Sequence, residues 1–582
     1  MSDWLGFFST KPTPARSIES TISTTSNSCH PSWTTSDSRL TVSITPHISH
    51  CGDTLLLLAG YVYNHKSIRN SLRFASWRSD SVAETLVEGF AQKGLSLVLD
   101  LRGSFAFAVY DYRSGQLLLG RDRVGLQPLY LRWQDDGLFF STQQSDLIQS
   151  RALTKSAVSQ YLAFGHLSHA STLSSSDNVC LFCLPPGSAA RINHSRSHDF
   201  IHYWPPQPRP EWTHLSFGNT LSVPSLLRQQ LDLLICSQLD LVSHAVCLVN
   251  SDVESYCLAS LVHHQRPQSF NSLSLVLPGE RYHQFPGSNS GSYSLPHEII
   301  AVSRDCALAV IESTLAGPNF LSLLNPLFFL RLHFAASYSP TSLFTSLGAR
   351  ELFSHLDICQ ILGIPGVLKT VPLPILLNSL RLFNIIKLPR RFLSSSSHFL
   401  SATVLLSDYP NILSLIDPSL PLPSLPQFFL QQLPDNIARM KWIVLRGILQ
   451  PLSLPILSST SSVPKPHVFA PFLDHTLVEL ALRTSLDVNR HHHNILLSAC
   501  SDLFPKSIPC SFSQRTSSEF HGWMCGPLRS ICLSRLDSLK CSGLFNEHWL
   551  QSQINSVKSG IFNTVLIWRL VLLGEYYQRQ HH

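Results

Sequence analysis

The sequence contains few charged residues and no run of one sign. Asp, Glu, Lys and Arg make up 14% of the 582 residues, and 43 basic residues stand against 37 acidic ones. A nucleic-acid-binding protein concentrates Lys and Arg on one face or along one helix. Because the basic residues here are spread along the chain, we expect no nucleic-acid partner.

Long hydrophobic runs are missing as well. The two most apolar stretches, residues 321–336 and 561–573, contain Arg331 and Arg569 and fall short of the roughly 20 residues that span a bilayer. The first twenty residues lack the apolar core of a secretory signal peptide. We therefore expect no membrane partner, a cytoplasmic location and reduced thiols.

The 14 cysteines form no zinc pattern. Cys180 and Cys183 are a close pair, but no second pair follows at zinc-ribbon spacing. Leu181 and Phe182 lie between them and predict a buried strand. The histidine run at 491–493 predicts an exposed helix start, because consecutive side chains on a helix point in different directions.

What the sequence does have is enough apolar material for packed cores, at 44% hydrophobic residues. With 582 residues the chain is too long to fold around a single hydrophobic core, so we expect two domains. Four prolines between Trp204 and Trp212 rule out a regular element there. We predict a first domain at 1–204, a linker at 205–224 and a second domain at 225–582.

Residues 40–140 predict short strands separated by turns and one helix. The strands are Thr54–Tyr63, Phe105–Tyr110, Gln116–Gly120, Leu129–Trp133 and Leu138–Ser141. We expect Ser79 and Asp80 to cap a helix in which apolar residues recur at helical spacing after residue 81. The stretch GRDRVGLQPLYLRW, at 120–133, predicts a hairpin with its turn at Val124–Pro128.

The second half predicts alternating helices and strands. We expect a helix near Ser225–Leu239, a strand at Ala245–Val249 and a helix at about Ser255–His263. This alternation is typical of a parallel sheet covered by helices.

Several blocks resemble the glutamine-hydrolysing asparagine synthetases. Leu101–Trp133 is similar to that family's hairpin motif, and GYVYNH at Gly60–His65 resembles its NGEIYN strand. HEIIAV at His297–Val302 and PFLDHTLVELAL at Pro471–Leu482 resemble later family blocks. The resemblance implies an α+β N-terminal-nucleophile-type αββα sandwich followed by an α/β parallel-sheet synthetase domain with added helices.

The resemblance also implies a chemistry, in which glutamine is hydrolysed at a first site and ATP with Mg²⁺ activates a carboxylate at a second. At the first site the family uses an N-terminal Cys, and Ser2 stands in its place. No stretch supplies the Arg that grips glutamine, and Ala59 replaces an Asn. Gly60 and Asp80 are the substrate-binding residues that remain.

The second site is altered in the same way. The family's phosphate-binding loop, SGGLDSS, corresponds to NSDVESY at Asn250–Tyr256. Ser251 and Asp252 replace the two glycines that let backbone N–H groups approach an anion. Glu254 takes the acidic position, and Ser255 is unchanged. We expect ATP binding at this loop to be impaired by the negative charge of Asp252.

The metal-binding block of the family, GDGADE, corresponds to SLGARE at Ser346–Glu351. Leu347 and Arg350 occupy acidic positions, which leaves Glu351 as a weak Mg²⁺ ligand. Contact of Arg350 with phosphate in place of the metal is an alternative. Further along, Ser517 stands where the family has a Lys.

Three functions follow from these residues. The first is an inactive family member whose scaffold binds a protein partner. The second is an amide-forming ligase that does not use glutamine, similar to β-lactam synthetases or lasso-peptide cyclases, with a small-molecule or peptide carboxylate as substrate. The third is asparagine synthesis itself.

Overall fold

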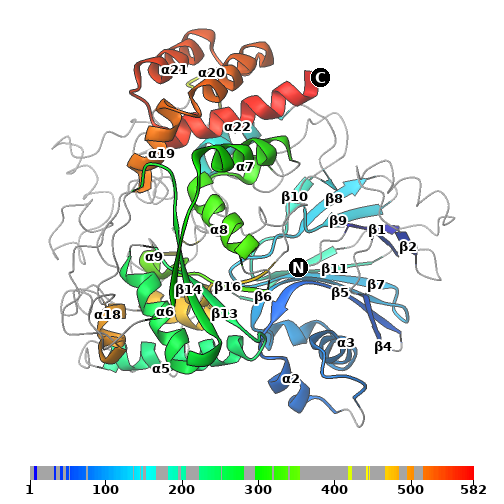
Figure 1. The fold of residues 1–582 in the computed structure, drawn as a ribbon. Coiled ribbons are helices and arrows are strands. Elements are labelled where there is room, and N and C mark those ends of the chain that lie inside the picture. Colours follow the sequence, from blue (N-terminus) through cyan, green and yellow to red (C-terminus); the bar gives the residue numbers. More distant parts are fainter. Residues whose placement is uncertain are drawn as a thin grey trace, which may run out of the picture. The chain divides into compact units, whose positions relative to one another are not determined.

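The fold is described from a computed structural model (Figure 1). The described residues are 5–9, 32–34, 40–43, 48–51, 53–73, 77–134, 137–143, 146–147, 153–165, 181–193, 198–204, 222–250, 252–280, 295–317, 320–338, 341–353, 417–421, 441–442, 445, 466–483, 495–503 and 516–581.

The chain forms two compact units. The first comprises Met1–Ala157, Leu167–Gln207 and Ser453–His467, and the second comprises Val158–His166, Pro208–Leu452 and Val468–His582. One junction between the units, at Gln207 and Pro208, lies in the proline-rich segment.

The first unit contains two six-stranded antiparallel sheets. One sheet has the order β10 (Leu181–Cys183), β8 (Tyr130–Gln134), β9 (Gly137–Ser141), β1 (Leu5–Ser9), β3 (Leu40–Ser43) and β2 (Ser32–Thr34). The other has the order β12 (His198–His202), β11 (Ser188–Ile192), β7 (Gln116–Arg121), β6 (Gly103–Asp111), β5 (Thr54–Val62) and β4 (Ile48–Cys51). The five strands predicted between residues 54 and 141 are confirmed, with small shifts at their ends, and Leu181–Cys183 is the strand expected between the cysteines.

Alternation along the strands builds the core of this unit, because successive side chains point to opposite faces of a sheet. On β6, Ala106 and Ala108 face the other sheet and pack with residues such as Phe8 and Phe140. The neighbouring Phe107 points the other way, into a second apolar cluster. The two sheets therefore stack face to face, and the second sheet is apolar on both sides.

Helices cover the outer face of that second sheet (Figure 1). They are α2 (His65–Ser71), α3 (Val82–Lys93) and the 3₁₀ helix η1 (Gly94–Leu99). Leu86, Val87 and Phe90 of α3 are buried against it, as their helical spacing predicted. The predicted cap is wrong by one residue, because the Ser81 hydroxyl, not Ser79 or Asp80, accepts the N–H of Glu84.

The predicted hairpin within residues 120–133 is wrong. β7 and β8 belong to different sheets, and each pairs with other strands: β7 with β6 and β11, β8 with β9 and β10. The segment between them carries the chain from one layer to the next.

Two charged residues of this crossover are buried and hold its backbone. Asp122 is 1% exposed and accepts the N–H groups of Gly125 (2.6 Å), Leu126 (3.1 Å) and Gln127 (2.9 Å). Arg121 donates to the carbonyls of Gly125 (2.6 Å) and Gln127 (2.6 Å). The backbone groups of this segment cannot pair within either sheet. The side chains of Asp122 and Arg121 therefore provide their hydrogen-bond partners.

The second unit contains a five-stranded sheet. Its order is β15 (His297–Ala301), β14 (Phe270–Val276), β13 (Ala245–Leu248), β16 (Ser342–Phe344) and β17 (His467–Phe469). β13 pairs in parallel with β14 and β16, and β14 pairs in parallel with β15. The predicted alternation of helices and parallel strands is confirmed.

The helices of the chain beyond η1 have the following bounds: α4 (Lys155–Phe164), α5 (Ser222–Leu239), α6 (Val253–Gln265), α7 (Arg304–Ala316), α8 (Pro326–Tyr338), α9 (Ala349–Phe353), α16 (His475–Arg483), α18 (Ile495–Ala499), α19 (Thr516–Cys525), α20 (Arg529–Ser538), α21 (Glu547–Ser559) and α22 (Thr564–His581). Short 3₁₀ helices lie at Pro267–Ser269, Phe320–Ser322, Pro471–Leu473, Ser501–Leu503 and Leu539–Ser542.

The two apolar stretches noted in the sequence form largely buried helices, α8 and α22. In the part of the chain that the structure describes, no single helix is long and apolar enough to cross a membrane. The pair α21 and α22 reaches that length together but is bent by 117°. The predicted histidine run at 491–493 lies outside the described residues.

Replacing Asp122 by Asn tests the role of the crossover. The amide loses the charge that three N–H groups share, so we expect the free energy of unfolding to fall by about 3 kcal/mol. Urea unfolding curves measure this change. Asp100→Asn is the matched control, because Asp100 pairs with Lys93 at the surface and such pairs contribute less than about 1 kcal/mol. Equal effects of the two substitutions contradict the assignment.

Candidate functional site

The five-stranded sheet has a point where its strand order reverses. β13 comes first in the chain, β14 and β15 extend the sheet on one side of it, and β16 follows on the other. In open parallel sheets, ligands bind beyond the carboxyl ends of the strands at such a point. The segments that leave β13 and β16 are therefore the candidate site of this unit, and they carry the residues that the sequence singled out.

The segment after β13 is closed by its own side chains. Asp252 is the N-cap of α6, and its carboxylate accepts the N–H of Ser255 at 2.7 Å. The Ser255 hydroxyl accepts the N–H of Asn250 at 3.0 Å and lies 3.1 Å from the Asn250 carbonyl oxygen. Ser251 lies outside the described residues. Asn250, Asp252 and Ser255 thus form one hydrogen-bonded turn at the start of the helix.

Acidic residues gather beside this turn. Burial raises the pKa of the Glu351 carboxyl on α9, and the negative charges of Glu254 and Asp252 raise it further, against the lowering effect of Arg350. The charges of Glu254 and Asp252 are the smaller contributions to this shift, after burial and Arg350. The Arg350 side chain is exposed on α9.

This arrangement does not fit a polyphosphate. A phosphate binds the free N–H groups at a helix N-terminus, and the Asp252 carboxylate already accepts the N–H of Ser255. Two like charges about 4 Å apart repel by roughly 4 kcal/mol at an effective dielectric constant of about 20. The residues present therefore disfavour ATP at this turn.

The residues also fit Mg²⁺ poorly. Among the described residues, no group of three or more His, Cys, Asp and Glu side chains is placed to hold a metal ion. A raised pKa of Glu351 further reduces its value as a ligand, because a carboxylate must be ionised to bind the ion.

The first unit contains Gly60 and Asp80, the two residues that the sequence predicts for a glutamine site. Gly60 lies on β5 with a φ of +88°, and a Cβ atom there would overlap the carbonyl oxygen of Ser104 and lie 2.9 Å from Cγ of Gln127. Ala59, which replaces the family's Asn, is 2% exposed and packs in the core between the sheets. Ser2 lies outside the described residues.

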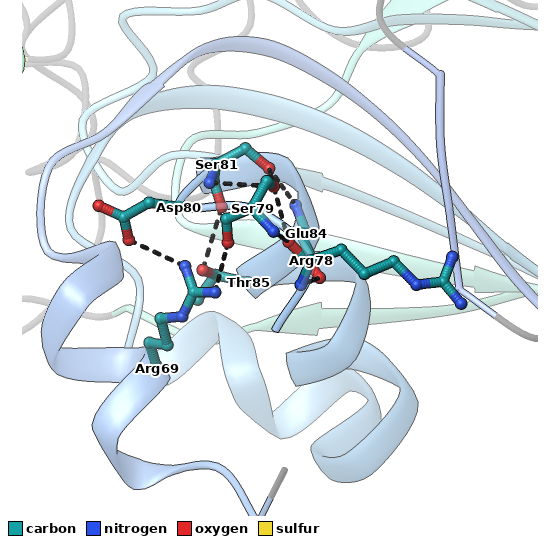
Figure 2. A network of polar contacts seen from close by, with 7 residues as sticks. All are labelled: Arg69, Arg78, Ser79, Asp80, Ser81, Glu84 and Thr85. Atoms are coloured by element: carbon teal, nitrogen blue, oxygen red, sulfur yellow. Dashed lines mark hydrogen bonds and ion pairs between the residues drawn. The ribbon is translucent and has the colours of Figure 1, made fainter. Parts of the chain in front are cut away.

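Arg69 on the helix α2 forms an ion pair with Asp80 (Figure 2). Its carboxylate accepts a hydrogen bond from Nη1 of Arg69 at 2.9 Å, although 77% of the Asp80 side chain is exposed. Arg69 also donates to the Ser79 carbonyl and lies 4.0 Å from the ring centroid of Trp77. Asp80 therefore already has a cationic partner in Arg69.

Glu84 holds the same segment from the other side (Figure 2). Its carboxylate accepts the N–H groups of Arg78 and Ser79, both at 2.7 Å, and the Ser79 hydroxyl at 2.6 Å. These bonds, the Ser79 hydroxyl first, lower the pKa of Glu84 below its usual value. Arg69 and Glu84 were not predicted from the sequence, although Ser81 and Glu84 have the spacing of a capping box.

Comparison with known proteins finds similarity mainly in the sequence of the first unit. Residues 37–204 match the family model of the glutamine amidotransferase domain. Asparagine synthetase [glutamine-hydrolyzing] 3 of Arabidopsis thaliana is 34% identical over 89 residues, which are 15% of this chain and 15% of that protein. Asparagine synthetase B of Escherichia coli is 32% identical over 97 residues, 16% of this chain and 17% of that protein.

Residues 37–204 are thus similar to a glutamine amidotransferase domain, and short stretches of the chain are similar to asparagine synthetases. Asparagine synthetase 2 of Bacillus subtilis adds a match of 28% identity over 102 residues, 18% of this chain and 14% of that protein. The chain matches less than a fifth of the length of these three relatives. The similarity therefore does not transfer their activity to this chain.

Solved structures add little to this. Glutamine phosphoribosylpyrophosphate amidotransferase from B. subtilis, complexed with ADP and GMP, aligns with a TM-score of 0.21 and 13% identity over 40% of this chain and 51% of that chain. A TM-score this low supports no argument about this chain.

The Glu84 network predicts a pH-dependent stability. A folded-state pKa below the unfolded value of about 4.3 stabilises the fold above that pH, and the contribution is lost as the pH falls through the folded-state pKa. We expect Glu84→Gln to lower the melting temperature at pH 7 and to have a smaller effect at pH 3. Thermal unfolding at both pH values measures this.

Asp80→Asn serves as a control in the same segment, because it changes a more exposed carboxylate that accepts no backbone N–H in the described contacts. Its effect at pH 7 should be smaller than that of Glu84→Gln. A Glu84→Gln effect that is the same at both pH values contradicts the role of the ionised carboxylate.

Proposed function

We propose that this chain is an asparagine synthetase family member that has lost ATP-dependent amide formation and acts as a binding protein through its retained scaffold. The observation that carries the proposal is the bond from the Ser255 N–H to the Asp252 carboxylate. The turn supplies its own anion at the position where such a site takes phosphate. A protein partner and a cytoplasmic location remain predictions of the sequence.

The state of the glutamine site supports the same proposal. Ser2 replaces the nucleophilic Cys, Ala59 is packed between the sheets, and Asp80 is paired with Arg69. A glutamine amino group would have to compete with that guanidinium for the Asp80 carboxylate. Each of these features reduces binding or attack of glutamine, and together they leave no ammonia source for synthesis.

The alternative is an amide ligase that takes its amine directly and acts on a small-molecule or peptide carboxylate. The substitutions in the glutamine site agree with it. Such a ligase still needs ATP at the turn after β13, however, and the acidic residues Asp252, Glu254 and Glu351 oppose that. Nucleotide binding therefore separates the two candidates.

Calorimetric titration with ATP and Mg²⁺ tests the proposal. We expect no measurable heat of binding for the natural chain at millimolar nucleotide, and measurable binding for the double variant Ser251→Gly with Asp252→Gly. The glycines free the Ser255 N–H and remove one negative charge, which is worth roughly 4 kcal/mol at short range.

The matched control is Ser303→Gly. Ser303 caps α7 by accepting the N–H of Cys306 at 3.2 Å, so this variant loses a helix cap without changing the turn after β13. It should bind no more ATP than the natural chain. Tight ATP binding by the natural chain, with release of AMP and pyrophosphate, would falsify the proposal and favour the ligase.

A further inference from the structure

One edge of the five-stranded sheet is formed by β15. In the part of the chain that the structure describes, this strand pairs with β14 alone. Glu298, Ile299 and Ala301 are exposed, Ile299 to 48%. The strand contains neither Lys nor Pro, residues that protect exposed edges from pairing with another chain. It belongs to neither site described above and is a candidate interaction surface.

The backbone of β15 has one side turned away from the sheet. The carbonyl of Pro296, just before the strand, accepts an N–H of β14 at 2.8 Å, and the N–H of Val302, just after it, donates to a β14 carbonyl at 3.0 Å. Successive residues of a strand direct their backbone groups alternately to its two sides. The N–H and C=O groups of Ile299 and Ala301 therefore point to the open edge.

The side chains of the strand alternate between two faces. The carboxylate of Glu298 accepts a hydrogen bond from the Tyr338 hydroxyl on α8, so Glu298 and Ile300 lie on the face that α8 covers. Ile299 and Ala301 lie on the opposite face, where both are exposed. Sheets of parallel strands are normally covered on both faces. Ile299 therefore leaves apolar surface available for contact at the edge.

A second copy of β15 fits this edge. Two identical strands can pair antiparallel around a two-fold axis perpendicular to the sheet. An axis at Ile300 places Ile299 of each copy opposite Ala301 of the other. These residues direct their N–H and C=O groups at the edge, as a hydrogen-bonded antiparallel pair requires. Both symmetry-related pairs can thus form in one register.

The position of Glu298 favours this register over its neighbours. An axis at Glu298 would place two carboxylates directly opposite, and an axis at Ile299 would leave them diagonal neighbours about 7–8 Å apart. In the register described, each Glu298 lies opposite Val302 of the second copy, two residues before Arg304 at the start of α7. A helix N-terminus and Arg304 attract negative charge, although Asp305 follows.

We propose that β15 is a self-association surface, at which two copies of this chain pair antiparallel through their β15 strands with the two-fold axis at Ile300. The two five-stranded sheets then form one continuous sheet. Ile299 of each copy packs on Ala301 of the other, which adds apolar burial to the backbone hydrogen bonds. One short strand offers less contact area than the roughly 1,600 Å² of a stable complex, so the dimer dissociates on dilution.

Sedimentation equilibrium of the full chain tests self-association. We expect a monomer–dimer equilibrium with a dissociation constant of about 1–100 µM. Ile299→Lys should raise that constant by about tenfold or more, because it places a charge against the apolar contact on each side of the axis. The circular dichroism spectrum should not change, since Ile299 is exposed.

Leu233→Lys is the matched control. Leu233 is a 59% exposed apolar residue on α5, and the same charge there should leave the dissociation constant unchanged. A natural chain that stays monomeric at about 500 µM, well above the expected constant, overturns the proposal. That result is the one expected if the edge pairs with a different protein. A dimer that Ile299→Lys does not weaken overturns the proposal as well.

Disulfide crosslinking tests the register. Opposite residues at a non-hydrogen-bonded position have Cα atoms about 4.5 Å apart, within the range that a disulfide spans. Ile300→Cys should therefore link two copies through position 300 under mild oxidation, as identified by peptide mass spectrometry. Glu298→Cys is the control, because its two copies lie four residues apart along the strands, about 13 Å, which is too far for a disulfide.

The natural cysteines do not obscure this result. The exposed Cys236, Cys306 and Cys541 can also oxidise, but their linked peptides differ in mass from those of position 300. A link through position 298, or none through position 300 at a concentration where the chain is dimeric, contradicts the proposed pairing. These measurements need no nucleotide, so their failure is distinct from a failure of the function proposed above.

Discussion

Carboxylates that accept backbone N–H groups hold the irregular segments of this protein in place. Asp122 accepts three such groups in the crossover between the sheets, Glu84 accepts two before α3, and Asp252 accepts one at the start of α6. A buried or partly buried N–H without a partner is costly. Each acidic side chain relieves that cost where the regular hydrogen bonding of a sheet or helix stops.

The contact of Asp252 shows how the start of α6 is stabilised without a bound anion. At the turn after β13, a side chain performs the task that a bound phosphate performs in a site with glycines, namely accepting the N–H of a helix terminus. A helix cap of this kind stabilises by about 1 kcal/mol. The Asp252 side chain thus satisfies the N–H of Ser255 from within the chain.

Much of the fold follows from patterns in the sequence, because strand alternation and helical spacing are local. β5 and β6, the helix with Leu86 and Phe90, and the run from α5 to α6 could be predicted in this way. The partner of a strand is not local. The stretch at 120–133 has the turn chemistry of a hairpin, but its two strands enter different sheets, which depends on residues far along the chain.

The candidate sites were predictable to a similar degree. The acidic positions Asp252, Glu254 and Glu351 were identified from the sequence, and in the structure the charges of Asp252 and Glu254 raise the pKa of Glu351. Capping of α6 by Asp252 follows from its place three residues before Ser255, yet which N–H it accepts needs coordinates. The pairing of Asp80 with Arg69 could not be read from spacing, because two helices and the segment between them must first be positioned.

Gly60 illustrates a limit on inferring chemistry from identity of residues. Its positive φ and the oxygen of Ser104 beside it admit no side chain, whatever reaction the neighbouring strand once served. Glycine would be kept at this position in an active and in a silent family member alike. Counting it as a surviving catalytic feature would mistake a steric requirement of the β5 and β6 pairing for a trace of activity.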